Sequence, residues 1–177
     1  LSSNNNLDFS RYNYFFAEYL LSNEKFDKAE KIINSSIEKH PRNILLNQLK
    51  LDLDNKKFES VFNCQNQTHI IAELFYITAN ALSSQSIFKF SNFYLNIAKY
   101  LNKEFHSFDT LLAENFYKSN NLKHSKKIYE RIGKKGQAYF WYAAKQNVKI
   151  LIKENQKNKG ILNLEKAYNK LIGKNIY

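Results

Sequence analysis

The sequence predicts an all-α fold, and three observations lead to this prediction. Its 177 residues include four glycines and one proline, two residue types on which the frequent turns of a β-sandwich or barrel depend. Apolar residues make up 44% of the chain and recur in blocks at the helical spacing i, i+3, i+4, i+7. One cysteine excludes a disulfide framework and a cysteine-based zinc site, so long helices joined by short polar turns are expected to bury the core.

Three helices are expected in the first third of the chain. The first begins near Tyr12 and is broken by the polar residues 22–24. The second begins at Phe26 and ends before Pro41, because proline disfavours helical geometry in the residue that precedes it. Asn43 is a good N-cap for the third helix. The apolar stripe of that helix consists of Leu45, Leu46, Leu49 and Leu53.

The sequence that follows the third helix breaks the pattern. Residues 64–68 are polar and aperiodic, and the second repeat lacks the pattern of a full second helix, so we expect an irregular segment around residues 58–68. Helical periodicity then resumes in six blocks, at residues 70–82, 87–101, 107–118, 122–132, 138–154 and 159–171. Counted as five pairs, with a degenerate second helix in the second pair, the pattern is interpreted as ten helices joined by turns of a few residues.

Small residues recur twelve positions apart along these blocks. The pairs are Ala17 and Ala29, Ala79 and Ser91, Ala113 and Ser125, and Val148 and Gly160. A small residue where two helices cross lets their backbones approach, so each pair predicts one crossing. We therefore expect Ala17, Ala29, Ala79, Ala98, Ala113 and Ala167 to be buried at close crossings.

This frame resembles the tetratricopeptide repeat, a helix–turn–helix unit of about 34 residues, and in particular the bacterial multi-repeat proteins of that family. The resemblance implies a short N-terminal segment, residues 1–9, and then a single solenoid over residues 10–177. Its repeats would span residues 10–43, 44–71 (degenerate), 72–105, 106–140 and 141–174. The sequence departs from the family pattern at Asn13, where an aromatic residue is usual, and at Val148 and Gly160, which replace alanines.

The resemblance implies an α–α superhelix of about five helix pairs whose concave groove is lined by the first helix of each pair. The implied partner-binding residues are Tyr14, Glu18, Tyr76, Asn80, Glu114, Tyr117, Tyr142, Lys145, Lys149 and Lys153, with Arg11, Glu73 and Thr110 beside them. Tyrosine suits a binding surface because it offers apolar area and a hydroxyl group. The alternative for each tyrosine is that it fills a gap between adjacent repeats.

Positive charge gathers in the last third of the chain. The formal net charge is +11, and residues 118–177 hold 15 basic and 3 acidic side chains. Lys145, Lys149 and Lys153 are spaced i, i+4, i+8 and therefore lie on one face of one helix. Two explanations stay open: an anion-binding end, or the lysine enrichment that an A/T-rich genome gives to solvated helix faces.

No catalytic or metal-binding pattern is found in the sequence. The histidines lie at positions 40, 69, 106 and 124, and none is four residues from another histidine or from Cys64. The turn from Gly133 to Gly136 lacks the following Ser or Thr and the spacing of a phosphate-binding loop. The sequence therefore predicts neither an enzyme nor a cofactor or metal site.

The predicted function is a protein-interaction scaffold that holds a peptide or a partner helix, with an acidic partner suited to the basic end. The alternative is binding of nucleic acid or an acidic surface through the lysine-rich C-terminal repeats. No stretch approaches the roughly 18 continuous apolar residues of a membrane span. The chain starts at Leu1 and contains no methionine, which predicts a fragment of a longer protein. An export signal could precede it, so a periplasmic and a cytoplasmic location both stay open.

Overall fold

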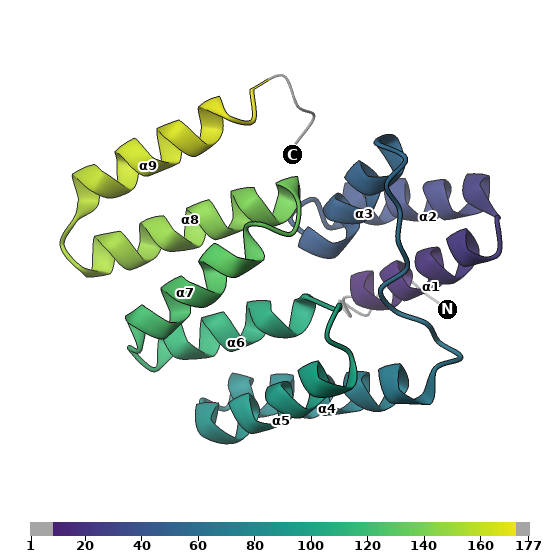
Figure 1. Ribbon diagram of the computed structural model, residues 1–177, viewed down its shortest axis with the longest axis horizontal. Coiled ribbons are helices and arrows are strands. Elements are labelled where there is room, and N and C mark those ends of the chain that lie inside the picture. Colours follow the sequence, from purple (N-terminus) through teal and green to yellow (C-terminus); the bar gives the residue numbers. More distant parts are fainter. Residues whose placement is uncertain (1–8, 173–177) are drawn as a thin grey trace. The chain divides into compact units, whose positions relative to one another are not determined.

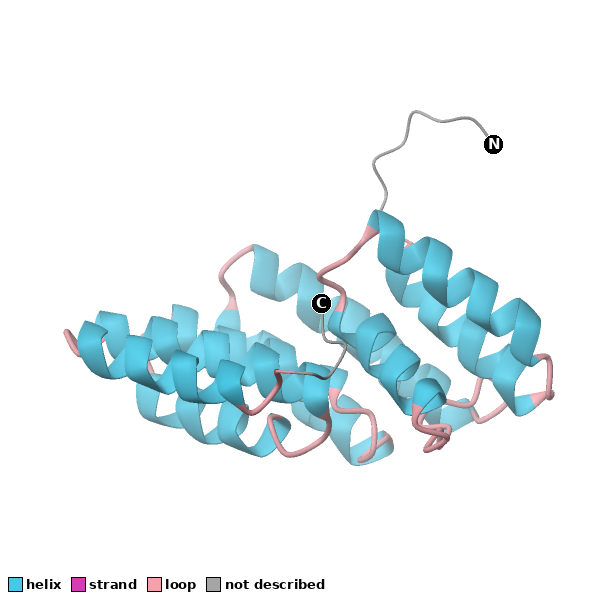
Figure 2. Cartoon of the chain, turned by 90° about the horizontal axis from the view of Figure 1, so that it is seen from above, coloured by secondary structure: helices cyan, strands magenta, loops and turns pink. Residues whose placement is uncertain are grey.

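The computed structural model describes residues 9–172, and within that range it consists of helices and loops (Figures 1 and 2). The all-α prediction is confirmed. The described residues contain nine helices where ten were expected. They are α1 (Ser10–Ser22), α2 (Phe26–Lys39), α3 (Ile44–Asp54), α4 (Gln67–Ser84), α5 (Phe88–Leu101), α6 (Ser107–Lys118), α7 (Leu122–Ile132), α8 (Gln137–Lys153) and α9 (Lys157–Asn169).

The helices form two compact units. The N-terminal unit holds α1, α2 and α3, and the C-terminal unit, which starts at Cys64, holds α4 to α9. In the C-terminal unit the hairpins α4–α5, α6–α7 and α8–α9 follow one another, and the second helix of each hairpin packs against the first helix of the next (Figure 1). No described helix is long and apolar enough to cross a membrane.

The missing tenth helix belongs to the second repeat, as its degenerate sequence predicted. Residues 58–66 are irregular, and α4 begins at Gln67 where the periodicity had placed its start at Ile70. The difference arises because the Asn66 side chain caps α4, with its Oδ1 accepting from the N–H of Thr68 at 2.9 Å.

Five helices end in the same turn, which defines the repeat more sharply than the sequence did. After α1, α3, α4, α6 and α8 one residue has a positive φ, and the next N–H donates to a carbonyl five residues earlier, at 2.7–2.9 Å. The positive-φ residues are Glu24, Lys56, Ser86, Asn120 and Asn155. Because α3 carries this turn at Lys56, α3 is the first helix of a pair whose second helix is absent.

The predicted small-residue crossings are confirmed. All six alanines named above are buried, five of them completely. Where serine stands in the second helix, its hydroxyl crosses to the first: Ser91 Oγ donates to the Ala79 carbonyl at 2.7 Å, and Ser125 Oγ to the Ala113 carbonyl at 2.8 Å. Each crossing has room for only a small side chain, and the serine hydroxyl finds a hydrogen-bond acceptor there in the backbone of the facing helix.

Candidate functional site

In the N-terminal unit, two predicted groove residues are buried inside the protein. Tyr14 is 5% exposed and Glu18 is 1% exposed. The Glu18 carboxylate accepts hydrogen bonds from the Tyr14 hydroxyl at 2.7 Å, the Phe62 N–H at 2.9 Å and the Val61 N–H at 3.3 Å. Burial raises the pKa of Glu18 to about 7, although these three donors pull it down.

The segment that carries Val61 and Phe62 covers this face of α1. The Phe62 ring stacks on Phe15 with centroids 4.1 Å apart, and Glu18 holds the segment's backbone. The segment thus lies where a partner was expected to reach Tyr14 and Glu18. The placement of these two residues on an open groove is therefore corrected, because the part of the chain that replaces the absent helix packs over them.

In the C-terminal unit, the predicted tyrosines and Glu114 are half-buried on the first helices. The Tyr76 ring lies 5.7 Å from Phe108, and Tyr142 lies edge-on to Tyr129 at 5.8 Å. Burial, with smaller effects of neighbouring Glu114 and Tyr76, raises the pKa of Tyr142 to about 12. Tyr76 thus packs from α4 against α6, and Tyr142 packs from α8 against α7.

The three lysines of α8 are exposed, and the last of them reaches α6. Lys153 Nζ lies 4.9 Å from the centre of the Tyr117 ring, and Lys145 Nζ lies 5.6 Å from that of Trp141. Lys149 is exposed on the same face of α8, and Asn80 is exposed on α4. We call Lys145, Lys149, Lys153 and Tyr117 the lysine face.

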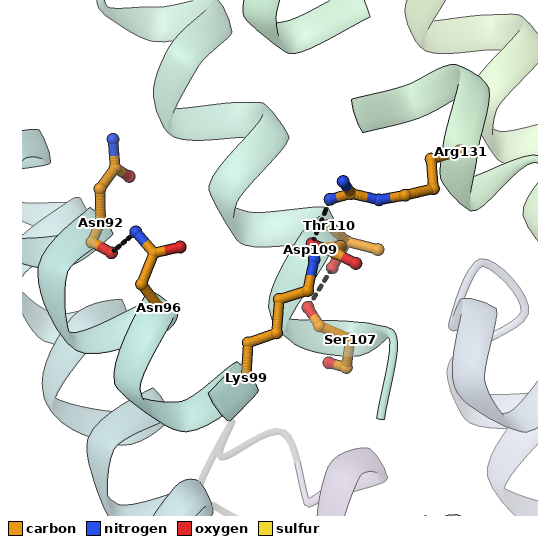
Figure 3. A network of polar contacts seen from close by, with 7 residues as sticks. All are labelled: Asn92, Asn96, Lys99, Ser107, Asp109, Thr110 and Arg131. Atoms are coloured by element: carbon orange, nitrogen blue, oxygen red, sulfur yellow. Dashed lines mark hydrogen bonds and ion pairs between the residues drawn. The ribbon is translucent and has the colours of Figure 1, made fainter. Parts of the chain in front are cut away.

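An ion cluster around a buried carboxylate, which the sequence analysis did not predict, joins three helices of the C-terminal unit (Figure 3). The Asp109 carboxylate of α6 is 7% exposed and pairs with Lys99 of α5 at 2.6 Å and with Arg131 of α7 at 2.8 Å. Asp109 stands four residues before Ala113, at the same repeat position as Asn13. A carboxylate at that position was the signal available in the sequence, because burial there requires cationic partners.

A cavity of about 470 Å³ opens between α7, α8 and α9 of the same unit. Its lining includes Lys134, Lys166, Phe140 and Asn147. The buried Asn147 Oδ1 accepts no hydrogen bond from the described residues. No described group of three or more His, Cys, Asp and Glu side chains is arranged to hold a metal ion.

The paired helices, their recurring turns and the small residues at their crossings define an all-α helical-repeat fold, a solenoid of the form seen in tetratricopeptide-type proteins. Among solved structures, the crystal structure of MamA, a protein of that type, is similar: it covers 96% of both chains with a TM-score of 0.50 at 16% identity. No family model matches the chain, and neither does any curated protein at the level searched. The likeness to MamA establishes the fold, and it indicates no enzyme family.

Proposed function

We propose that the protein is an interaction scaffold whose C-terminal unit binds an acidic segment of a partner protein along the lysine face. The observation that carries the proposal is the row of three exposed lysines on α8, whose last member lies over Tyr117 of α6. Such a row offers several cations to an extended chain of carboxylates, and the tyrosine adds apolar area beside them. The scaffold class of the fold supports this use of the surface.

Nucleic acid is the alternative ligand, favoured by the net charge of +11. The two ligands differ in their response to salt. Binding of RNA through phosphate contacts weakens steeply as salt rises, because each neutralised phosphate releases condensed counterions. A short acidic peptide has a lower charge density and lacks the condensed counterion layer, so its affinity falls less.

The test reverses the charge of the row in the variant K145E/K149E/K153E. Binding of a fluorescein-labelled Glu-rich peptide and of labelled single-stranded RNA is measured by anisotropy at about 50 and 200 mM salt. We expect the variant to bind the peptide at least about tenfold more weakly than the wild type, because three attractive charges become repulsive.

The matched control is K123E/K126E/K127E on α7, which changes the net charge by the same amount on another helix. We expect this control to retain peptide binding. Equal loss in both variants would show a general charge effect and would contradict a site on the lysine face. Tighter binding of RNA than of peptide at both salt concentrations would favour the alternative.

A further inference from the structure

The sequences of the last two repeats align with a constant offset of 35 residues. The offset relates Ala113 to Val148, which both stand at a helix crossing. It also relates Asn120 to Asn155, which are both the positive-φ residue of the turn that follows. Applied to the ion cluster, the offset pairs Asp109 with Ala144 and Arg131 with Lys166. Lys99 lies in the third repeat, whose offset to the fourth is 34 residues, so it corresponds to Gly133, directly before Lys134.

The last repeat thus has Lys166 in place of Arg131, Lys134 one position beyond the equivalent of Lys99, and no carboxylate in place of Asp109. Lys134, Ala144 and Lys166 all line the cavity between α7, α8 and α9. In the fourth repeat Asp109, which aligns with Ala144, bonds both cations through one oxygen, Oδ1 (Figure 3). Among the described residues, neither Lys134 nor Lys166 forms an ion pair, and the lining holds one carboxylate, that of Glu130.

A second feature of the cavity concerns hydrogen bonding. Asn147 occupies the position of Leu112, a buried apolar residue of the fourth repeat. Its Oδ1 is buried, lacks a donor among the described residues, and belongs to a side chain that lines the cavity. A buried acceptor without a donor is unfavourable, so a ligand with an N–H group would satisfy it.

We propose that this cavity binds a carboxylate that carries a neighbouring amide N–H, as an acidic side chain or a chain end of a peptide does. Lys134 and Lys166 hold the carboxylate as Lys99 and Arg131 hold Asp109, and Asn147 accepts the N–H. The volume of about 470 Å³ matches a small ligand or a few peptide residues. Ala144 and Asn147 lie on the side of α8 opposite the lysine face, so this site is independent of the function proposed above.

The test uses the variant Ala144→Asp, which places a carboxylate of the protein itself in the cavity, at the position equivalent to Asp109. Binding is followed by NMR titration of backbone amide signals at residues 143–147. The probes are N-acetylglycine, which mimics a chain end, and N-acetylaspartic acid α-amide, which mimics an acidic side chain. We expect saturable shifts in the wild type with at least one of the two, and which one binds identifies the source of the carboxylate.

Ala144→Asp is expected to weaken this binding by about tenfold or more and to raise the melting temperature, because the new carboxylate occupies the place between the two lysines. The matched control Ala144→Asn has the same shape without the charge and is expected to retain binding. A second variant, K134Q/K166Q, is expected to lose binding while leaving the helices intact by circular dichroism.

The role of Asn147 is tested with N-acetylsarcosine, which lacks the N–H. Weaker binding than N-acetylglycine in the wild type, and equal binding in Asn147→Leu, would support it; equal binding in the wild type would overturn it. The proposal itself is overturned if neither carboxylate gives saturable shifts, if Ala144→Asp binds as the wild type does, or if inorganic phosphate alone binds.

Discussion

At the residue scale, Glu18 shows how a single side chain compensates for a missing helix. Its carboxylate accepts two backbone N–H groups from an irregular segment that no second helix supports. The position of Glu18 was visible in the sequence, and its burial was not, because burial depends on a chain segment more than 40 residues away. Spacing within a helix predicts which face a residue lies on, whereas it does not predict what packs over that face.

The pKa of Glu18 makes the stability of the N-terminal unit depend on pH. The folded carboxyl has a pKa of about 7 and the unfolded one about 4.5, so between these values the folded state holds a proton that the unfolded state has released. Stability attributable to Glu18 therefore falls as pH rises from about 4.5 to about 7, by up to about 3 kcal/mol, and is constant above that.

Urea unfolding of the wild type and of Glu18→Gln between pH 4 and 8 measures this dependence. The variant cannot titrate at this position, so the difference between the two curves isolates Glu18 from every other group. We expect the difference to change across the stated window, and parallel curves would contradict the expectation. The variant should also be less stable at low pH, because its amide N–H₂ faces backbone donors.

At the element scale, the five recurring turns contain residues other than glycine at the position where glycine is usual. The position after each first helix requires a positive φ, which glycine adopts without strain and other residues adopt at some cost. The chain uses Glu, Lys, Ser and Asn there instead. The sequence predicted the turns from breaks in periodicity, and it could not predict their geometry because the usual glycine is absent. The turns at Glu24, Lys56 and Ser86 thus carry a steric cost that the turns with asparagine largely avoid.

Glycine substitution at these turns is expected to stabilise the protein unequally. Glu24→Gly removes the steric cost of a positive φ and should raise the free energy of unfolding by roughly 0.5–1 kcal/mol. Asn155→Gly should gain less, because asparagine tolerates this conformation. Urea midpoints measure the effect, and Glu24→Ala is the matched control that keeps the strain. Equal shifts for Glu24→Gly and Glu24→Ala would show that φ does not limit stability here.

At the scale of the whole molecule, the period of small residues was the most informative signal in the sequence. It placed the crossings in four repeats, and buried Ala17, Ala29, Ala79, Ala113 and Gly160 confirm them. The sequence offered a carboxylate at position 109 as a signal, but the partners of Asp109 and the cavity beside Ala144 could not be predicted from it. The ion cluster and the cavity each depend on contacts between residues of different helices. The periodicity within one helix does not predict such contacts. The turn residues Asn120 and Asn155 fix an offset of 35 residues between the last two repeats, and this offset relates Asp109 of the ion cluster to Ala144 of the cavity.

The division into two units predicts that overpacking one crossing acts locally. Ala29 is fully buried against α1 in the N-terminal unit, so Ala29→Leu forces extra atoms into that crossing and should destabilise the unit by roughly 1–3 kcal/mol. Because contacts concentrate within each unit, amide hydrogen exchange should accelerate in α1–α3 more than in α4–α9. The converse variant, Ala113→Leu, overpacks the α6–α7 crossing and should accelerate exchange chiefly in the C-terminal unit. Uniform acceleration through all described helices by either variant would mean that the two units unfold as one.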